Sequence, residues 1–119
     1  MTATDRALEL VRAAAAAAAE KQASDLIAFD VSDQLAITDV FLLCSANSQP
    51  QMKAVKEEIE DALLKLGAKT LRREGERDSR WILMDYGDIV VHIQHTEERA
   101  FYALERLWSD CPAIDLKLS

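Results

Sequence analysis

Residues 80–92, which read RWILMDYGDIVVH, contain the pattern that decides the fold. Two apolar runs meet at Gly87-Asp88, where a two-residue turn would fold them into a β-hairpin, because glycine tolerates the positive φ that such turns require. We therefore predict two antiparallel strands in which Tyr86 pairs with Ile89. The same register pairs Met84 with Val91, Leu83 with His92 and Trp81 with Gln94.

The two faces of this hairpin differ in composition, because successive side chains along a strand point to opposite sides of the sheet. One face is apolar and is expected to lie on the core; its residues are Ile82, Met84, Tyr86, Ile89, Val91 and Ile93. The other face combines rings, a carboxylate and an imidazole; its residues are Trp81, Leu83, Asp85, Val90, His92 and Gln94. We expect this mixed face to meet water or a partner.

Periodicity and capping signals on both sides of the hairpin predict the remaining elements. Alanine-rich residues 4–22 favour a helix, and a capping-box pattern at residues 48–51 opens another that Gly67 ends. Strands are expected at 26–31, 40–45 and 68–73. With a final helix that Thr96 would cap, the order α-β-β-α-β-β-β-α predicts an α/β (α+β) fold, a single five-stranded mixed sheet packed with helices.

The final helix is expected to bury one stripe, and residues 1–3 and 112–119 are expected to be loose ends of the chain. Tyr102 and Glu105 lie on the flank of that stripe and are interpreted as structural. We expect one domain over residues 1–119 with an ordered core at about 4–110. The predicted stripe consists of Phe101, Leu104, Leu107 and Trp108.

Composition limits the classes of protein to which the chain can belong. Two cysteines, Cys44 and Cys111, are too few for a secreted disulfide framework. No run has the apolar length of a membrane helix, and the first 23 residues lack the pattern of a signal peptide. We therefore expect a cytoplasmic protein that does not contact membranes.

The formal net charge of −7 argues against binding to a nucleic-acid backbone, which needs concentrated Lys and Arg. Four arginines do gather between residues 72 and 80, but acidic side chains alternate with them. An acidic domain of this kind is steered toward a basic partner. The arginines are Arg72, Arg73, Arg77 and Arg80, and the interleaved acids are Glu74, Glu76 and Asp78.

Several motifs together resemble the ribosomal silencing factor family, RsfS, also called the Iojap-like family. The hairpin pattern Trp-Ile-Leu-x-Asp-Tyr-Gly-Asp-x-Val-Val-His is followed by Phe-Tyr-x-Leu-Glu-x-Leu-Trp. The resemblance covers roughly residues 4–110 in the order and spacing of the family. It also includes the segments at 24–31, 37–41, 45–51 and 73–76.

The resemblance implies a function that composition and periodicity do not reveal. Family members bind ribosomal protein number fourteen on the large ribosomal subunit, block joining of the small subunit, and so repress translation when nutrients are scarce. It also implies that the hairpin region meets the ribosome, and it leaves open whether the free protein forms a homodimer. We therefore expect a partner-binding site for the large-subunit protein at Glu74, Trp81, Leu83, Asp85, Tyr86, Asp88 and His92.

Some of these residues also have an ordinary structural interpretation. Trp81 could be a core tryptophan, and Asp88 could satisfy backbone donors in the turn. Asp85 has no obvious partner within the chain and would suit an Arg or Lys of another protein. His92 could be a hydrogen-bonded sheet residue instead of a contact residue.

The family resembles the nucleotidyltransferase fold, which raises an enzymatic alternative. Such transferases hold two metal ions with carboxylates at Asp-x-Asp spacing after a Gly-Ser turn, and neither pattern occurs in this chain. His92 and His95 are spaced oddly along a strand, so their side chains point to opposite faces and are not expected to share a metal. We expect no catalysis, cofactor or metal; the alternatives are a nucleotidyltransferase-like enzyme and an adaptor without a ribosomal partner.

Overall fold

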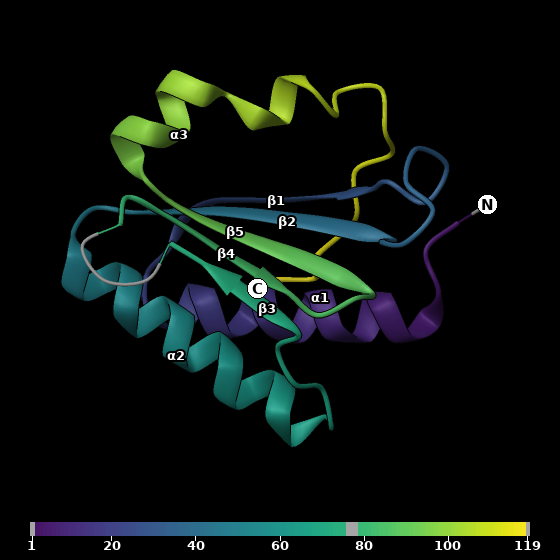
Figure 1. The fold of residues 1–119 in the computed structure, drawn as a ribbon, viewed down its shortest axis with the longest axis horizontal. Coiled ribbons are helices and arrows are strands. Elements are labelled where there is room, and N and C mark those ends of the chain that lie inside the picture. Colours follow the sequence, from purple (N-terminus) through teal and green to yellow (C-terminus); the bar gives the residue numbers. More distant parts are fainter. Residues whose placement is uncertain (1, 76–78, 119) are drawn as a thin grey trace.

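A five-stranded sheet with the strand order β1-β2-β5-β4-β3 forms the centre of the molecule (Figure 1). The computed structural model describes residues 2–75 and 79–118. Strands β2 and β5 run parallel, and every other neighbouring pair is antiparallel, so the predicted mixed sheet is confirmed. The strands are β1 (Ser24–Asp30), β2 (Val40–Ala46), β3 (Arg72–Glu74), β4 (Trp81–Asp85) and β5 (Ile89–His95).

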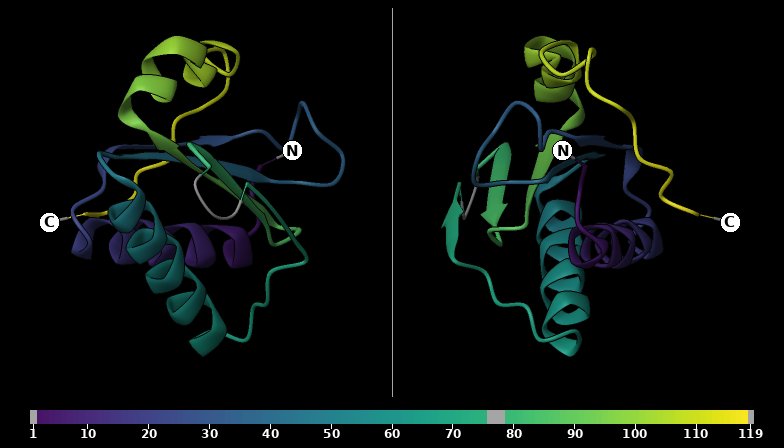
Figure 2. Two further views of the ribbon diagram at one scale, coloured as in Figure 1. Left: turned by 60° about the vertical axis from the view of Figure 1, so that its left-hand side comes forward. Right: turned by 90° about the vertical axis from the view of Figure 1, so that its right-hand side faces the viewer.

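Helices cover the two faces of the sheet unequally (Figures 1 and 2). The long helices α1 (Asp5–Glu20) and α2 (Gln49–Lys65) pack on the apolar face. The opposite face is covered by the short α3 (Thr96–Tyr102), a 3₁₀ turn, η1 (Leu104–Arg106), and the chain around Leu35 and Cys111. The main core therefore lies between the sheet and the first two helices. The cluster of buried apolar side chains on the other face is much smaller.

The hairpin has the register that its sequence predicts. Trp81 lies opposite Gln94, and Leu83 lies opposite His92. The backbone N–H of Tyr86 donates to the carbonyl oxygen of Ile89 at 2.9 Å, and Gly87 has a φ of +85°. The predicted apolar face is buried in the main core, because the period of two places every second side chain against α1 and α2.

The ends of α2 also follow the sequence. The Ser48 hydroxyl accepts from the N–H of Gln51 at 3.2 Å, and the Gln51 side chain accepts in return from the N–H of Asn47 at 2.7 Å. Gly67 adopts a φ of +81° just after the helix. The third strand is shorter than the predicted range of 68–73 and begins further along the chain. It spans Arg72–Glu74, and its residues are exposed.

The final helix differs most from its prediction. His95, not Thr96, caps it, since the His95 Nδ1 atom accepts from the N–H of Glu97 at 3.2 Å. The helix ends at Tyr102 because Ala103 takes a left-handed conformation with a φ of +47°. The break ends the helical spacing on which the predicted stripe rests, and two of the four predicted members, one inside the helix and one after the break, are not buried. Phe101 is 81% exposed and Leu107 is 71% exposed, while Leu104 and Trp108 are half-buried.

The end of the chain packs along the outer edge of β1. The N–H of Asp30 donates to the carbonyl of Pro112, and the N–H of Ile114 donates to the carbonyl of Ala28. Leu116 joins the main core, so the expectation of a loose segment after residue 111 does not hold for residues 112–116. Within the described residues, no helix is long and apolar enough to cross a membrane.

Candidate functional site

The mixed face of the sheet is divided into a covered half and an open half. Because paired residues in neighbouring strands point the same way, Glu74, Leu83 and His92 form one row across β3, β4 and β5. Helix α3 and η1 lie over β5 and β2, and His92 on β5 is buried beneath them. Five residues on β3 and β4 remain exposed or half-buried, and we call them the open surface: Arg72, Glu74, Trp81, Leu83 and Asp85.

A row of rings crosses the boundary between these halves. Trp81 lies 5.0 Å from Tyr102 of α3 and 5.9 Å from His92, measured between ring centroids. His92 in turn meets Phe41 at 5.3 Å, and Phe41 meets Trp108 at 5.0 Å with nearly perpendicular planes. Edge and tilted contacts of this kind are favourable for aromatic pairs. Trp81 is therefore the point at which a packed aromatic row reaches the open surface.

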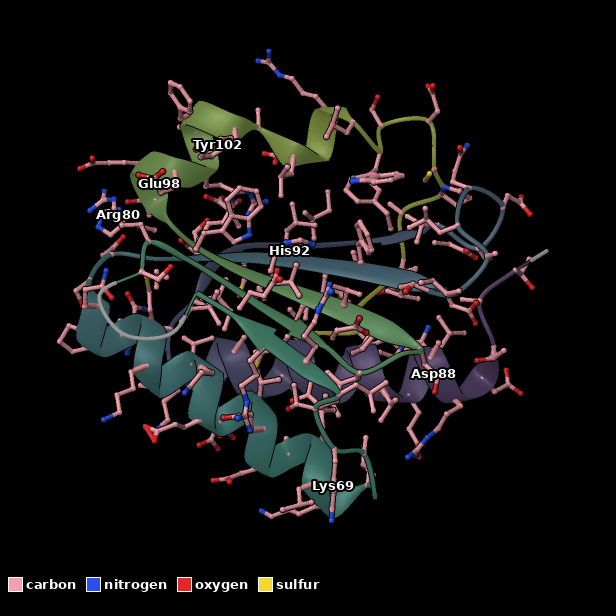
Figure 3. The ribbon with its side chains drawn as sticks, in the orientation of Figure 1. Lys69, Arg80, Asp88, His92, Glu98 and Tyr102 are labelled. Carbon is pink, nitrogen blue, oxygen red and sulfur yellow. The ribbon has the colours of Figure 1, made fainter. Side chains whose placement is uncertain are left out.

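A hydrogen bond defines the chemical state of His92. The indole Nε1–H of Trp81 donates to His92 Nδ1 at 3.1 Å, and because an indole nitrogen can only donate, Nδ1 must be the unprotonated acceptor. The proton of the neutral imidazole then lies on Nε2, which is buried and has no hydrogen-bond partner among the described residues. Figure 3 shows His92 between the sheet and α3.

Burial also keeps His92 neutral. Loss of solvent lowers the pKa of His92 from 6.5 to about 4. The unfolded chain therefore takes up this proton at a higher pH than the folded chain does. Between about 6.5 and 4 the unfolded state binds more protons, so His92 makes folding less favourable as the pH falls through that window.

Helix α3 is held on the sheet by two arginines. Arg99, with 8% of its side chain exposed, donates to the Ser45 hydroxyl at 3.1 Å and pairs with the Glu105 carboxylate at 3.2 Å. Arg80, just before β4, pairs with Glu97 at 3.1 Å and with Glu98 at 2.7 Å. Figure 3 shows Arg80, Glu98 and Tyr102 close together at this end of the sheet. These contacts place Tyr102 beside Trp81.

The two aspartates of the hairpin have different roles from those expected. Asp85 does have a partner in the chain, because its Oδ1 atom accepts from the N–H of Gly87 at 2.8 Å. It therefore performs the turn role that the sequence suggested for Asp88. Asp88 is exposed at the far end of the hairpin from Trp81 (Figure 3), since the whole of β4 separates them.

The other predicted site residues divide between the open surface and the buried interior. Glu74 and Leu83 lie on the open surface beside Trp81. Tyr86 is 7% exposed and belongs to the main core, while His92 is equally buried beneath the aromatic row. Neither ring is available for extensive contact with another protein. Glu76, Arg77 and Asp78 of the charged segment lie outside the described residues.

Three residues that shape the site are absent from the residues predicted for it: Phe41, Arg99 and Tyr102. The sequence indicates only a structural role for Tyr102, and its position beside Trp81 follows from how α3 docks. Phe41 could have been found by extending the alternation of β2 to the mixed face. Arg99 carried no signal, because a single arginine in a charged helix is usually solvated.

The site offers little that resembles catalytic chemistry. Within residues 2–75 and 79–118, no group of three or more His, Cys, Asp or Glu side chains is placed to hold a metal ion. Cys44 is fully buried, and its burial raises the pKa of the thiol to about 12, so it is not an activated nucleophile. The open surface instead presents an aromatic ring, an aliphatic side chain and charged groups on a rigid sheet, an arrangement that suits recognition.

Comparison with known proteins identifies the family. Residues 4–119 match the family described as "RsfS: Ribosomal silencing factor during starvation". The chain is 41% identical to the ribosomal silencing factor RsfS of Bacillus subtilis, over 90% of this chain and 91% of that protein. It is 32% identical to the chloroplastic protein Iojap of Zea mays over 86% of this chain, which spans 44% of the maize protein.

Solved structures show the same fold. A crystal structure from Bacillus halodurans matches with a TM-score of 0.78 at 36% identity, covering 90% of this chain and 97% of that one. A structure from Chromobacterium violaceum matches with a TM-score of 0.81 at 25% identity, covering 93% and 92%. These matches extend over the helices, the sheet and the site that they position, and the chain belongs to the ribosomal silencing factor (RsfS) family.

Proposed function

We propose that this protein silences ribosomes by occupancy: it binds ribosomal protein number fourteen on the large subunit and prevents the small subunit from joining. Translation would then be repressed under nutrient limitation. Membership of a family described as a silencing factor during starvation supports the ribosomal target. The net charge of −7 supports a basic partner, such as a ribosomal protein.

The observation that carries the proposal is the open surface around Trp81. Its indole is half-buried and held by two neighbouring rings, so little conformational entropy remains to be lost on binding. Aromatic side chains at the centre of an interface often supply a large share of its binding energy. Glu74, which pairs with Leu83, and Asp85, at the far end of β4, add negative charge to the open surface, which also holds Arg72 opposite Asp85.

Occupancy predicts inhibition that depends on stoichiometry. Purified protein mixed with separated subunits should lower the yield of joined ribosomes in proportion to the fraction of large subunits occupied, with no nucleotide consumed. Sucrose-gradient sedimentation measures joined and free subunits, and tagged protein should co-sediment with large but not small subunits. Added ribosomal protein number fourteen should compete and restore joining. Inhibition by far fewer molecules than large subunits, or inhibition that requires a nucleotide, would contradict occupancy.

Charge reversal at Asp85 would disturb the turn, so a milder change tests its part in binding. Asp85→Asn keeps an oxygen to accept from Gly87 N–H and removes only the charge. Because complementary charge acts mainly on encounter, we expect association at low salt to slow roughly two- to fivefold and to depend less on salt. Surface-based kinetics on immobilised large subunits measures both.

The matched control for this experiment is Asp110→Asn, which removes the same charge from an exposed residue near the end of the chain. Its association rate should stay close to that of the unaltered protein. Equal rates for all three proteins at low salt would show that Asp85 lies away from the partner.

Two other functions give different results in the same experiments. A nucleotidyltransferase-like enzyme would bind a nucleoside triphosphate with Mg²⁺, which calorimetry detects. An adaptor without a ribosomal partner would not co-sediment with either subunit. Neither alternative has a specific observation in its favour among the described residues.

A further inference from the structure

We propose that His92 is a positioning residue, which orients the Trp81 indole for the large-subunit partner without touching that partner itself. This inference rests on the proposed function of the open surface and assigns a role within it. The sequence suggested His92 as a contact residue, but it is 7% exposed beneath the aromatic row. Any contribution of its imidazole to binding must therefore act through a neighbour.

The neighbour is Trp81, and the contact is directional. The two residues are diagonal neighbours on β4 and β5, since Trp81 pairs with Gln94 and His92 with Leu83. The 3.1 Å bond from Nε1 to Nδ1 joins the side chains themselves. With the Tyr102 ring 5.0 Å away on another side, this bond restrains rotation of the indole, whose two side-chain torsions otherwise allow several orientations.

His92 is itself well fixed. It lies on β5, which is hydrogen-bonded to β2 on one side and to β4 on the other. Its ring packs against Phe41 at 5.3 Å, and Phe41 packs against Trp108. The acceptor atom is therefore held by the centre of the sheet, whereas the indole that it restrains sits at the boundary of the open surface.

The imidazole at this place carries a cost in folding stability. With Nδ1 accepting, the Nε2–H group is buried without a partner among the described residues, and such a donor makes folding less favourable. A phenylalanine would fill the space between Phe41 and Trp81 and remove the unpaired Nε2–H, but it would leave the Trp81 indole N–H without its acceptor. What phenylalanine lacks is the acceptor for the indole, so the acceptor is the feature that distinguishes histidine here.

A double-mutant cycle with Trp81→Phe, His92→Phe and the combined variant tests this role. Affinity for isolated large subunits is measured for each protein, together with the melting temperature. We expect His92→Phe to raise Kd about five- to tenfold, mainly through faster dissociation, while the melting temperature changes little, because a lost hydrogen bond offsets the removal of an unpaired donor. In the Trp81→Phe background, which has no indole to orient, the same change should alter Kd by less than about twofold.

Gln94→Leu provides the matched control. Gln94 is fully buried on the same strand and the same face, and neither polar atom of its amide has a partner among the described residues. Its replacement also removes unpaired polar atoms from β5, directly opposite Trp81, but it keeps His92 as the acceptor for the indole. Affinity should therefore stay unchanged. An equal loss for Gln94→Leu and His92→Phe would mean that any repacking of β5 weakens binding, and it would overturn the proposal.

A second measurement needs no partner. In the nuclear magnetic resonance spectrum of the free protein, the Trp81 indole N–H should exchange slowly with water, and the Trp108 indole serves as an internal reference. In His92→Phe the Trp81 signal should shift and exchange faster. An unchanged Trp81 signal, an equal loss of affinity in both backgrounds, or a large drop in melting temperature would each overturn the positioning role.

Binding to the large subunit and orientation of Trp81 by His92 are tested by different measurements. If the unaltered protein did not bind large subunits, the proposed function would fall and the partner-related half of this inference with it. The exchange rate of the indole N–H would then still decide whether His92 fixes the Trp81 side chain.

Discussion

Trp81→Ala is expected to weaken binding to the large subunit by about 2 kcal/mol or more, roughly thirtyfold in Kd, while the protein stays folded. The indole is the largest apolar group of the open surface, and its contacts with His92 and Tyr102 present it in a defined orientation. Truncation removes the ring that a partner would cover. Circular dichroism should show an unchanged fold, and the melting temperature should fall only slightly, because the ring is half-buried.

The comparison for this experiment is Leu64→Ala. Leu64 is 55% exposed on α2, on the opposite side of the sheet, so its truncation removes apolar surface without touching the proposed site. Its affinity should match that of the unaltered protein. If Trp81→Ala instead lost most of its thermal stability, Trp81 would be a core residue, and the open surface would be assigned to the wrong residues.

Gly75→Ala is expected to destabilise the protein by about 3 kcal/mol, combining a left-handed backbone that alanine adopts poorly with an overpacked contact. Gly75 has a φ of +77°, and a Cβ atom there would lie 1.9 Å from the carbonyl oxygen of Trp81. That oxygen belongs to the backbone of β4 and cannot turn away. Relief therefore requires β3 and β4 to separate, which would also displace Trp81 from the site.

The control is Gly67→Ala, which changes a glycine with a similar φ of +81° but whose added Cβ would meet only the Arg6 guanidinium at 3.9 Å. We expect it to lose about 1 kcal/mol, the part due to conformation alone. Urea unfolding measures both variants, and the large-subunit affinity of Gly75→Ala measures displacement of the site. Equal losses for the two variants would show that the chain near Gly75 moves aside freely and does not support β4.

The local parts of the fold could be predicted because the chemistry that determines them lies within a few residues. Gly87 and the alternation on both sides of it define the hairpin register, and Ser48 and Gln51 cap α2 through their own side chains. The final helix could not be predicted in the same way. Its apolar spacing continues beyond Tyr102, but the left-handed Ala103 interrupts it, and alanine gives no sign of that conformation.

For the candidate site, the sequence by itself determined which residues share the mixed face, because a period of two assigns each side chain to one side of the sheet. It also determined the family, through motifs that survive in order and spacing. Only the tertiary structure decided which part of that face is open, since this depends on where α3 docks and on Arg99 reaching Ser45 from 54 positions away in the chain. The same docking buried His92 and brought Tyr102 to Trp81. Such contacts join residues distant in sequence, so no local pattern of residue types contains them.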